Sequence, residues 1–175
     1  MGGAIEAAQT GLATAQSEFL RVADLVPADK WATQPEHGGW SAAELVAHLM
    51  MVERAVIEKA DRVTQKSPRQ VPFLKRLHLP MFLVEMRVVR RKSPLPINPE
   101  LLRGKEEMLA GLRETRERSL AFLEETRGRN LSEYCWAHPA IGTLNLYEWI
   151  RFLAAHQVRH TKQMRKIAGN LPKVI

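Results

Sequence analysis

The chain has 175 residues, a formal net charge of +7 and one cysteine, Cys135. This length predicts a single domain, residues 1–175, that can bury a core without disulfide or metal cross-links. One cysteine excludes an internal disulfide and favours a reducing compartment. There is no signal-peptide pattern and no run of about 18 apolar residues, so we expect a cytoplasmic protein without a membrane span.

The first segment, residues 5–26, predicts an amphipathic helix that Pro27 ends. Its apolar residues recur at spacings of three and four, which places them on one narrow stripe: Ile5, Ala8, Leu12, Ala15, Phe19, Val22 and Val26. A narrow stripe suits packing against nearly parallel helices, so we expect a structural role for this segment.

A second helix is predicted over residues 41–64. Ser41 and Glu44 have the spacing of a capping box, in which each side chain bonds to the backbone N–H of the other residue. Trp40, just before the cap, is assigned to packing at the helix start. His48 falls on the apolar stripe of this helix.

The next segment, residues 65–98, is interrupted by five prolines: Pro68, Pro72, Pro80, Pro94 and Pro96. Within it, residues 73–79 and 81–91 predict short helical pieces that are apolar on one side and basic on the other. So long a connection predicts a crossover between helices that are not antiparallel neighbours.

A third helix is predicted from Asn98-Pro99-Glu100, which has a capping residue followed by proline, to about Thr126. Its inward stripe of leucines is interrupted by Thr115, Arg116 and Ser119. We expect these side chains to bond to the backbone of their own helix. The alternative is that they mark the approach of a pocket.

Residues 130–143 predict a loop, and a fourth helix begins after it. Asn145 is its N-cap, Glu148 is the capping-box partner, and Gly169 lies at its end. No stretch shows the alternating, β-branched pattern of strands. The fold class is therefore predicted as all-α, a four-helix bundle with a long, partly helical crossover between the second and third helices.

Three histidines predict a metal site. His156 and His160 are four residues apart and share one helical face, so their rings can hold one ion between them. His48 also lies on an inward stripe. Since the chain has six histidines, such a pair also arises by chance. However, a buried imidazole needs partners for both ring nitrogens, and a shared cation would satisfy three rings at once.

Other polar residues are weaker candidates. Gln163, one turn after His160, is expected either to orient a histidine or to face solvent. Glu44 and Glu148 are candidate general bases, although the capping boxes already engage both. Four further residues with reactive side chains are assigned no catalytic role. We expect His37, His78 and His138 to be surface or loop residues, and Cys135 to be buried and inert.

These features resemble the DinB-like (YfiT-like) metalloenzyme superfamily. The resemblance rests on Gly39-Trp-Ser-Ala-Ala-Glu-Leu-Val-Ala-His48, on Gly142-Thr-Leu through His156-Gln-Val-Arg-His160, and on the long connection after the second helix. It implies an up-down-down-up four-helix bundle, often a homodimer. It also implies nickel or zinc bound by His48, His156 and His160, and a low-molecular-weight thiol, such as bacillithiol or mycothiol, as cosubstrate.

Three neutral imidazoles leave one position of a tetrahedral ion open, and such an ion can activate water or a thiol. The expected function is a metal-dependent enzyme acting on a small molecule, either a hydrolase or a thiol S-transferase. Two alternatives remain. The basic segment Lys75–Lys92 could bind nucleic acid or an anionic membrane surface. The protein could also be a catalytically inactive, stress-related member of the family.

Overall fold

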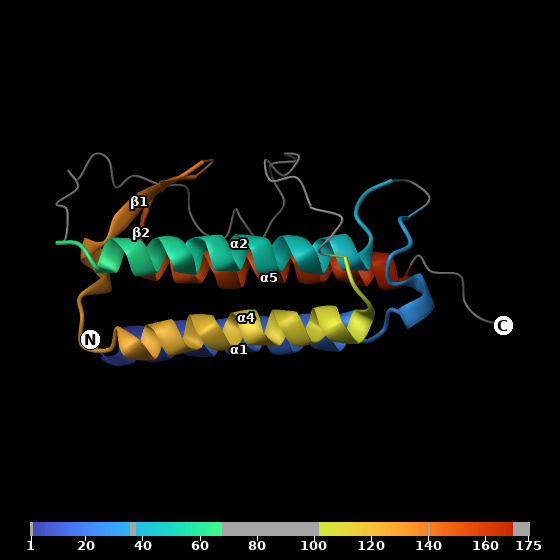
Figure 1. Ribbon diagram of the computed structural model, residues 1–175, viewed down its shortest axis with the longest axis horizontal. Helices are drawn as coiled ribbons and strands as arrows, with labels where there is room; N and C mark the ends of the chain where they lie inside the picture. Colours follow the sequence, from blue (N-terminus) through green and yellow to red (C-terminus); the bar gives the residue numbers. More distant parts are fainter. Residues whose placement is uncertain (1, 36–37, 68–101, 140, 170–175) are drawn as a thin grey trace.

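The computed structural model describes residues 2–35, 38–67, 102–139 and 141–169. These residues form four long α-helices, two 3-10 helices (Ala28–Lys30 and Leu131–Glu133) and one small antiparallel sheet (Figure 1). The α-helices are α1 (Gly2–Ala23), α2 (Ala42–Thr64), α4 (Lys105–Glu125) and α5 (Leu146–Gly169). The all-α class is confirmed. None of the described helices is both long and apolar enough to cross a membrane.

Helices α1 and α5 run in one direction along the bundle, whereas α2 and α4 run in the other (Figure 1). The order is up-down-down-up, as the family resemblance implied. Because α2 and α4 are parallel, α2 ends at the opposite end of the bundle from the start of α4. The connection between them is therefore a crossover, while the helical pieces predicted at residues 73–79 and 81–91 lie outside the described residues.

Helix α1 buries the narrow stripe that its spacing predicted. All seven apolar positions are at most 8% exposed: Ile5, Ala8, Leu12, Ala15, Phe19, Val22 and Val26. The helix ends at Ala23, three residues earlier than predicted. The N–H groups of Leu25 and Val26 then donate to the carbonyls of Val22 and Ala23, at 3.2 and 3.1 Å. This tightened last turn gives two of the last helix carbonyls hydrogen-bond partners and keeps Val26 in the core.

Helix α4 begins later than its sequence predicted. Residues 102–104 are not helical, and Gly104 is the N-cap, with its carbonyl accepting from the Met108 N–H at 3.0 Å. The predicted continuous helix is broken at Gly104, because glycine disfavours a helix interior, while the predicted start at residues 98–100 lies outside the described residues. The side chain of Lys105 holds the new start by donating to the Asp24 carbonyl at 3.0 Å.

The predicted loop at residues 130–143 contains a β-hairpin, which corrects the expectation that the chain has no strands. Strands β1 (Cys135–His138) and β2 (Gly142–Asn145) pair antiparallel. They are too short to show an alternating pattern, and an isolated two-stranded hairpin is marginal in water. Here the Trp136 ring stacks on Trp149 of α5 at 4.9 Å, and Trp149 Nε1 donates to the Trp136 carbonyl at 3.3 Å.

Two of the polar residues that interrupt the α4 stripe bond to their own helix, as predicted. The Thr115 hydroxyl donates to the Gly111 carbonyl at 2.7 Å, and the Ser119 hydroxyl lies 3.2 Å from the Thr115 carbonyl. Both hydroxyls also bond to α2: the Ser119 hydroxyl donates to Glu53 Oε1 at 2.6 Å, and the Thr115 hydroxyl accepts from Arg54 Nε at 3.1 Å.

Arg116 instead crosses the core. Its Nε and Nη2 donate to the two carboxylate oxygens of Glu53 on α2, at 2.8 and 2.9 Å. Its guanidinium also donates to the Leu12 carbonyl of α1 at 2.6 Å and to Gln157 Oε1 of α5 at 2.7 Å. Both charged side chains are at most 5% exposed. One guanidinium therefore links all four helices.

Candidate metal centre

The two helices that carry the histidines each begin with a capping box. On α2, Ser41 Oγ accepts from the Glu44 N–H at 3.2 Å, and the Glu44 carboxylate accepts from the Ser41 N–H at 2.7 Å. On α5, Asn145 and Glu148 make the same reciprocal bonds at 3.1 and 2.7 Å. Both predicted helix starts are confirmed. The caps satisfy the free N–H groups of each first turn and so define where each helix begins.

The three histidines converge between α2 and α5. His156 Nε2 lies 3.3 Å from His48 Nε2 and 3.1 Å from His160 Nε2. One ligand atom from each ring lies within 4.8 Å of the other two. Nitrogens bound to one tetrahedral zinc at about 2.0–2.1 Å lie about 3.3 Å apart. Two of the three nitrogen pairs therefore have the spacing that a shared tetrahedral ion requires.

Gln163 holds one of these rings. His160 Nδ1 lies 3.1 Å from Gln163 Oε1, and an amide oxygen can only accept a hydrogen bond. The Nδ1 proton of His160 therefore points to Gln163, and the Nε2 lone pair faces the other histidines. Of the two roles that the sequence left open for Gln163, this bond favours orienting a histidine.

Burial keeps two of the histidines, His48 and His156, in the neutral form that binds metals. It lowers the pKa of His48 to about 4, with a smaller contribution from the charge of Arg159. Burial also lowers the pKa of His156 well below its ordinary value, and the neighbouring His160, His48 and Arg159 add to the effect. Both rings are neutral at pH 7. Lone pairs that face one another repel unless a proton or a cation lies between them, so the donor set suits a divalent transition metal.

Aromatic rings flank the cluster, and the sequence pattern did not predict their contacts with the histidine rings. The Trp40 ring lies 4.7 Å from the His48 ring and 6.0 Å from the His160 ring. On the other side, Phe152 stacks on His156 at 5.3 Å. The contact with Phe152 could have been found from its spacing, since it lies four residues before His156 on one helix. Trp40 gave no such signal because one of its contacts is on a distant helix.

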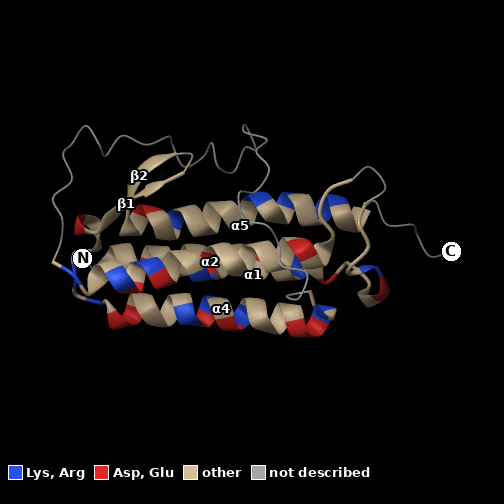
Figure 2. Cartoon of the chain, turned by 45° about the horizontal axis from the view of Figure 1, so that its top comes forward, with Lys and Arg blue, Asp and Glu red and all other residues tan. Residues whose placement is uncertain are grey.

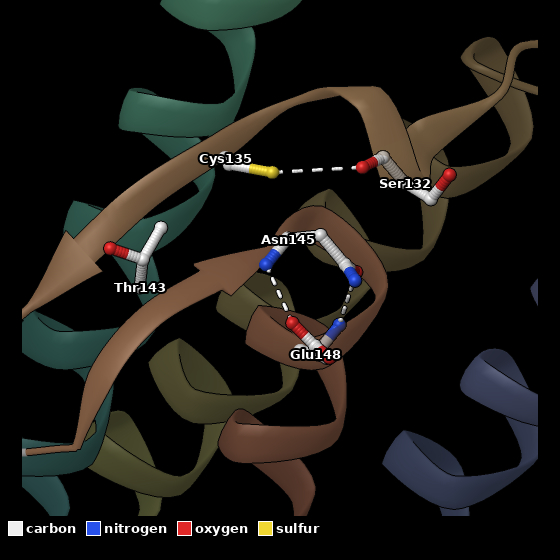
Figure 3. Close-up of a pocket in the computed structure, with 5 residues that line it drawn as sticks. All are labelled: Ser132, Cys135, Thr143, Asn145 and Glu148. Atoms are coloured by element: carbon white, nitrogen blue, oxygen red, sulfur yellow. Dashed lines mark hydrogen bonds between the residues drawn. The ribbon is translucent and has the colours of Figure 1, made fainter. Parts of the chain in front are cut away.

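The two candidate bases remain engaged at the helix starts. The Glu44 carboxylate also accepts from Gln34 Nε2 at 3.2 and 3.3 Å. Glu148 lies two helical turns before His156, and its carboxylate faces the Asn145 backbone (Figure 3). It borders a small polar cavity of about 70 Å³ at the start of α5, with these residues in its wall: Ser132, Cys135, Thr143, Asn145 and Glu148.

The expected burial of Cys135 and the expected surface or loop position of His138 were wrong, while the inertness of the Cys135 thiol stays a prediction. Cys135 is half-buried at this cavity, where its thiol donates to the Ser132 carbonyl at 3.6 Å (Figure 3). His138 is half-buried on β1 rather than on a surface loop. Its ring lies 4.7 Å from Phe152 and 5.2 Å from Trp149, and burial lowers its pKa.

Both errors follow from the hairpin, which carries these residues onto α5. Of the other histidines outside the cluster, His37 and His78 lie outside the described residues.

Comparison with known proteins agrees with this architecture. The profile of the DinB superfamily matches residues 12–164, a range that contains both capping boxes and all three histidines. The chain is also 24% identical over 147 residues to the uncharacterized protein YuaE of Bacillus subtilis (strain 168), covering 83% of this chain and 87% of YuaE. The chain therefore belongs to the DinB superfamily.

Proposed function

We propose that the protein binds a divalent metal ion, nickel or zinc, through Nε2 of His48, His156 and His160, and that it uses this ion as a catalytic centre. The observation that carries the proposal is the position of His156 Nε2, which lies 3.1 Å from His160 Nε2 and 3.3 Å from His48 Nε2. These two distances match the spacing of nitrogens around one tetrahedral ion, and one nitrogen of each ring lies within 4.8 Å of the other two. The lowered pKa values of His48 and His156 support the proposal, because metals bind the neutral imidazole.

Three protein ligands favour a catalytic rather than a structural site, because structural zinc takes a fourth protein ligand. A bound ion would lower the pKa of water or of a thiol, and the reaction would be attack of that nucleophile on a small electrophile. The protein would therefore act as a hydrolase or as a thiol S-transferase. Within this scheme, Gln163 orients His160, while Trp40 and Phe152 form apolar walls that limit the access of bulk water.

Metal content tests the binding step. The protein would be purified without an affinity tag, loaded with nickel or zinc, desalted and measured by elemental mass spectrometry. We expect one equivalent per chain for the wild type and loss of that equivalent in His48→Ala. His138→Gln is the matched control, because it removes a half-buried histidine outside the cluster and should keep the metal. Full metal content in His48→Ala would refute the proposed ligand set.

Turnover tests the catalytic step separately. Wild-type protein with metal would be incubated with a low-molecular-weight thiol and a chromogenic electrophile, and in parallel with activated esters. We expect a rate above the background that disappears when a chelator removes the metal. A protein that binds metal in full but shows no metal-dependent rate across both panels would instead support the alternative of a catalytically inactive family member.

A further inference from the structure

Two of the rings in the cluster, His48 and His160, are held in different ways. Both present Nε2 to His156 Nε2, at 3.3 and 3.1 Å, so each turns its Nδ1 away from the cluster. A neutral imidazole that binds a metal through Nε2 carries its proton on Nδ1, and this N–H needs an acceptor when it is buried. For His160 the acceptor is Gln163 Oε1, at 3.1 Å.

His48 lacks such an acceptor. The residue is 6% exposed, and its buried Nδ1 has no hydrogen-bond partner within the part of the chain that the structure describes. Met51 lies three residues after His48, the same spacing that separates Gln163 from His160, and a thioether is only a weak acceptor. The orientation of the His48 ring is therefore not fixed by a hydrogen bond at Nδ1.

Trp40 contacts this ring instead. Its indole lies 4.7 Å from the His48 ring, at an interplanar angle of 47°, and 6.0 Å from the His160 ring, at an angle of 21°. One side chain thus packs against a proposed ligand of α2 and a proposed ligand of α5. Trp40 directly precedes Ser41, the buried N-cap of α2, so the capping box also fixes the backbone from which the indole projects.

We infer that Trp40 is a positioning residue of the metal centre. The indole holds the His48 ring in its metal-binding orientation, in place of the hydrogen bond that the ring lacks, and keeps that ring beside His160. The inference rests on the proposed metal site. A ring that is already held by its neighbours loses less freedom when it binds an ion, so removing the indole should lower the affinity for metal.

Zinc affinity tests this role, measured by competition with a chromophoric chelator. We expect Trp40→Leu to bind zinc about 10- to 100-fold more weakly than the wild type. Trp40→Phe should stay within about threefold of the wild type, since a phenyl ring keeps a flat face against His48. If Trp40→Leu does not fold, Trp40→Met takes its place, because methionine fills space without a flat ring.

Trp136→Leu is the matched control. Trp136 is half-buried, as Trp40 is, but its ring stacks on Trp149 at 4.9 Å rather than on a proposed ligand. Its replacement should lower the free energy of unfolding of the metal-free protein and leave the zinc affinity unchanged. Urea unfolding of both leucine variants without metal separates damage to the fold from damage to the site.

The outcomes distinguish this inference from the proposed metal site. A wild-type protein that binds no zinc would refute both. If the wild type binds zinc, an unchanged affinity in Trp40→Leu, or an equal loss of affinity in Trp136→Leu, would refute the role of Trp40 alone. A Trp40→Phe variant that binds zinc as weakly as Trp40→Leu would also refute it.

Discussion

At His160, the ring nitrogen that faces away from the cluster donates to Gln163 at 3.1 Å, and this bond sets which nitrogen remains for a metal. We expect Gln163→Ala to weaken metal binding by about 10- to 100-fold, because the ring loses its orienting acceptor. Competition with a chromophoric chelator measures this effect.

The effect should be on affinity and not on folding, since Gln163 is half-buried near the end of α5. Gln9→Ala, which removes a surface amide bonded to Glu124, serves as the control. Equal metal affinity in Gln163→Ala and the wild type would show that the bond has no influence on the site.

The lowered pKa of His48 predicts how the stability of the metal-free protein depends on pH. Its pKa is about 4 in the folded chain against an ordinary value of 6.5. Between these values the unfolded chain binds a proton that the folded chain does not, so the free energy of unfolding falls as the pH drops. His48 alone should contribute a loss of about 3 kcal/mol, complete near pH 4. Urea unfolding at a series of pH values measures it.

A variant separates this histidine from other groups that titrate. His48→Gln should lose less stability between pH 6.5 and 4 than the wild type does. The carboxylate of Glu18, whose pKa is lowered to about 2 by its hydrogen bond to Arg21, acts at lower pH, where its stabilising effect is lost. If the free energy of unfolding of the two proteins falls by the same amount between pH 6.5 and 4, burial of His48 is not the source of the pH dependence.

At the scale of the elements, the caps of α2 and α5 place the histidines. Ser41 is 1% exposed, and its hydroxyl is the acceptor for the Glu44 N–H. We expect Ser41→Ala to lower the free energy of unfolding by about 1 kcal/mol, because one N–H of the first turn loses its partner. Chemical denaturation measures the change. Ser17→Ala, at an exposed position inside α1, is the control and should be neutral or slightly stabilising.

The hairpin also contributes to the surroundings of the site. Strand β1 brings His138 against Phe152, which in turn stacks on His156. The hairpin thus contacts a side chain, Phe152, that itself packs against one of the proposed metal ligands. The catalytic candidacy of Glu44 and Glu148 stays a prediction, because their bonds to the caps neither require nor exclude a role in proton transfer.

At the scale of the whole molecule, the buried pair Glu53–Arg116 holds the bundle together. Removing one partner leaves a charge without compensation in the core, so we expect Arg116→Met to lower the free energy of unfolding by about 3–5 kcal/mol. Replacing both, as Glu53→Leu with Arg116→Met, should recover most of that loss because no buried charge remains. Urea unfolding of the two variants measures this. A double variant that is as unstable as the single one would show that the hydrogen bonds to Leu12 and Gln157 matter more than the charge.

The distribution of charge bears on the alternative of a basic binding module. Acidic and basic residues alternate along α4, whereas basic residues gather toward the C-terminal end of α5 (Figure 2). There, Arg165 pairs with Glu18 of α1. The segment Lys75–Lys92, on which that alternative rests, lies outside the described residues. Binding to nucleic acid or to an anionic membrane therefore stays a prediction, as does the homodimer, and a steep loss of affinity with salt would reveal the former.

Local signals in the sequence were sufficient for the presence of the four helices, for the starts of α2 and α5, and for the inward faces of the three histidines. The capping boxes at Ser41 and Asn145 act within four residues, and the spacing of apolar residues reports directly which face of a helix is buried. The same spacing put His48, His156 and His160 on inward faces. Family resemblance added the order of the helices, which periodicity does not contain.

Contacts between distant segments decided the rest. Arg116 pairs with Glu53, and the Trp40 ring lies 6.0 Å from the His160 ring. The hairpin places His138 against Phe152 of α5 and Cys135 in a cavity that Glu148 borders. A four-residue strand has no pattern of its own, and an arginine on a helix face has no partner until another helix supplies it. The sequence alone determined which side chains face inward, and the tertiary structure decided which of them meet, because meeting depends on how separate helices pack in space.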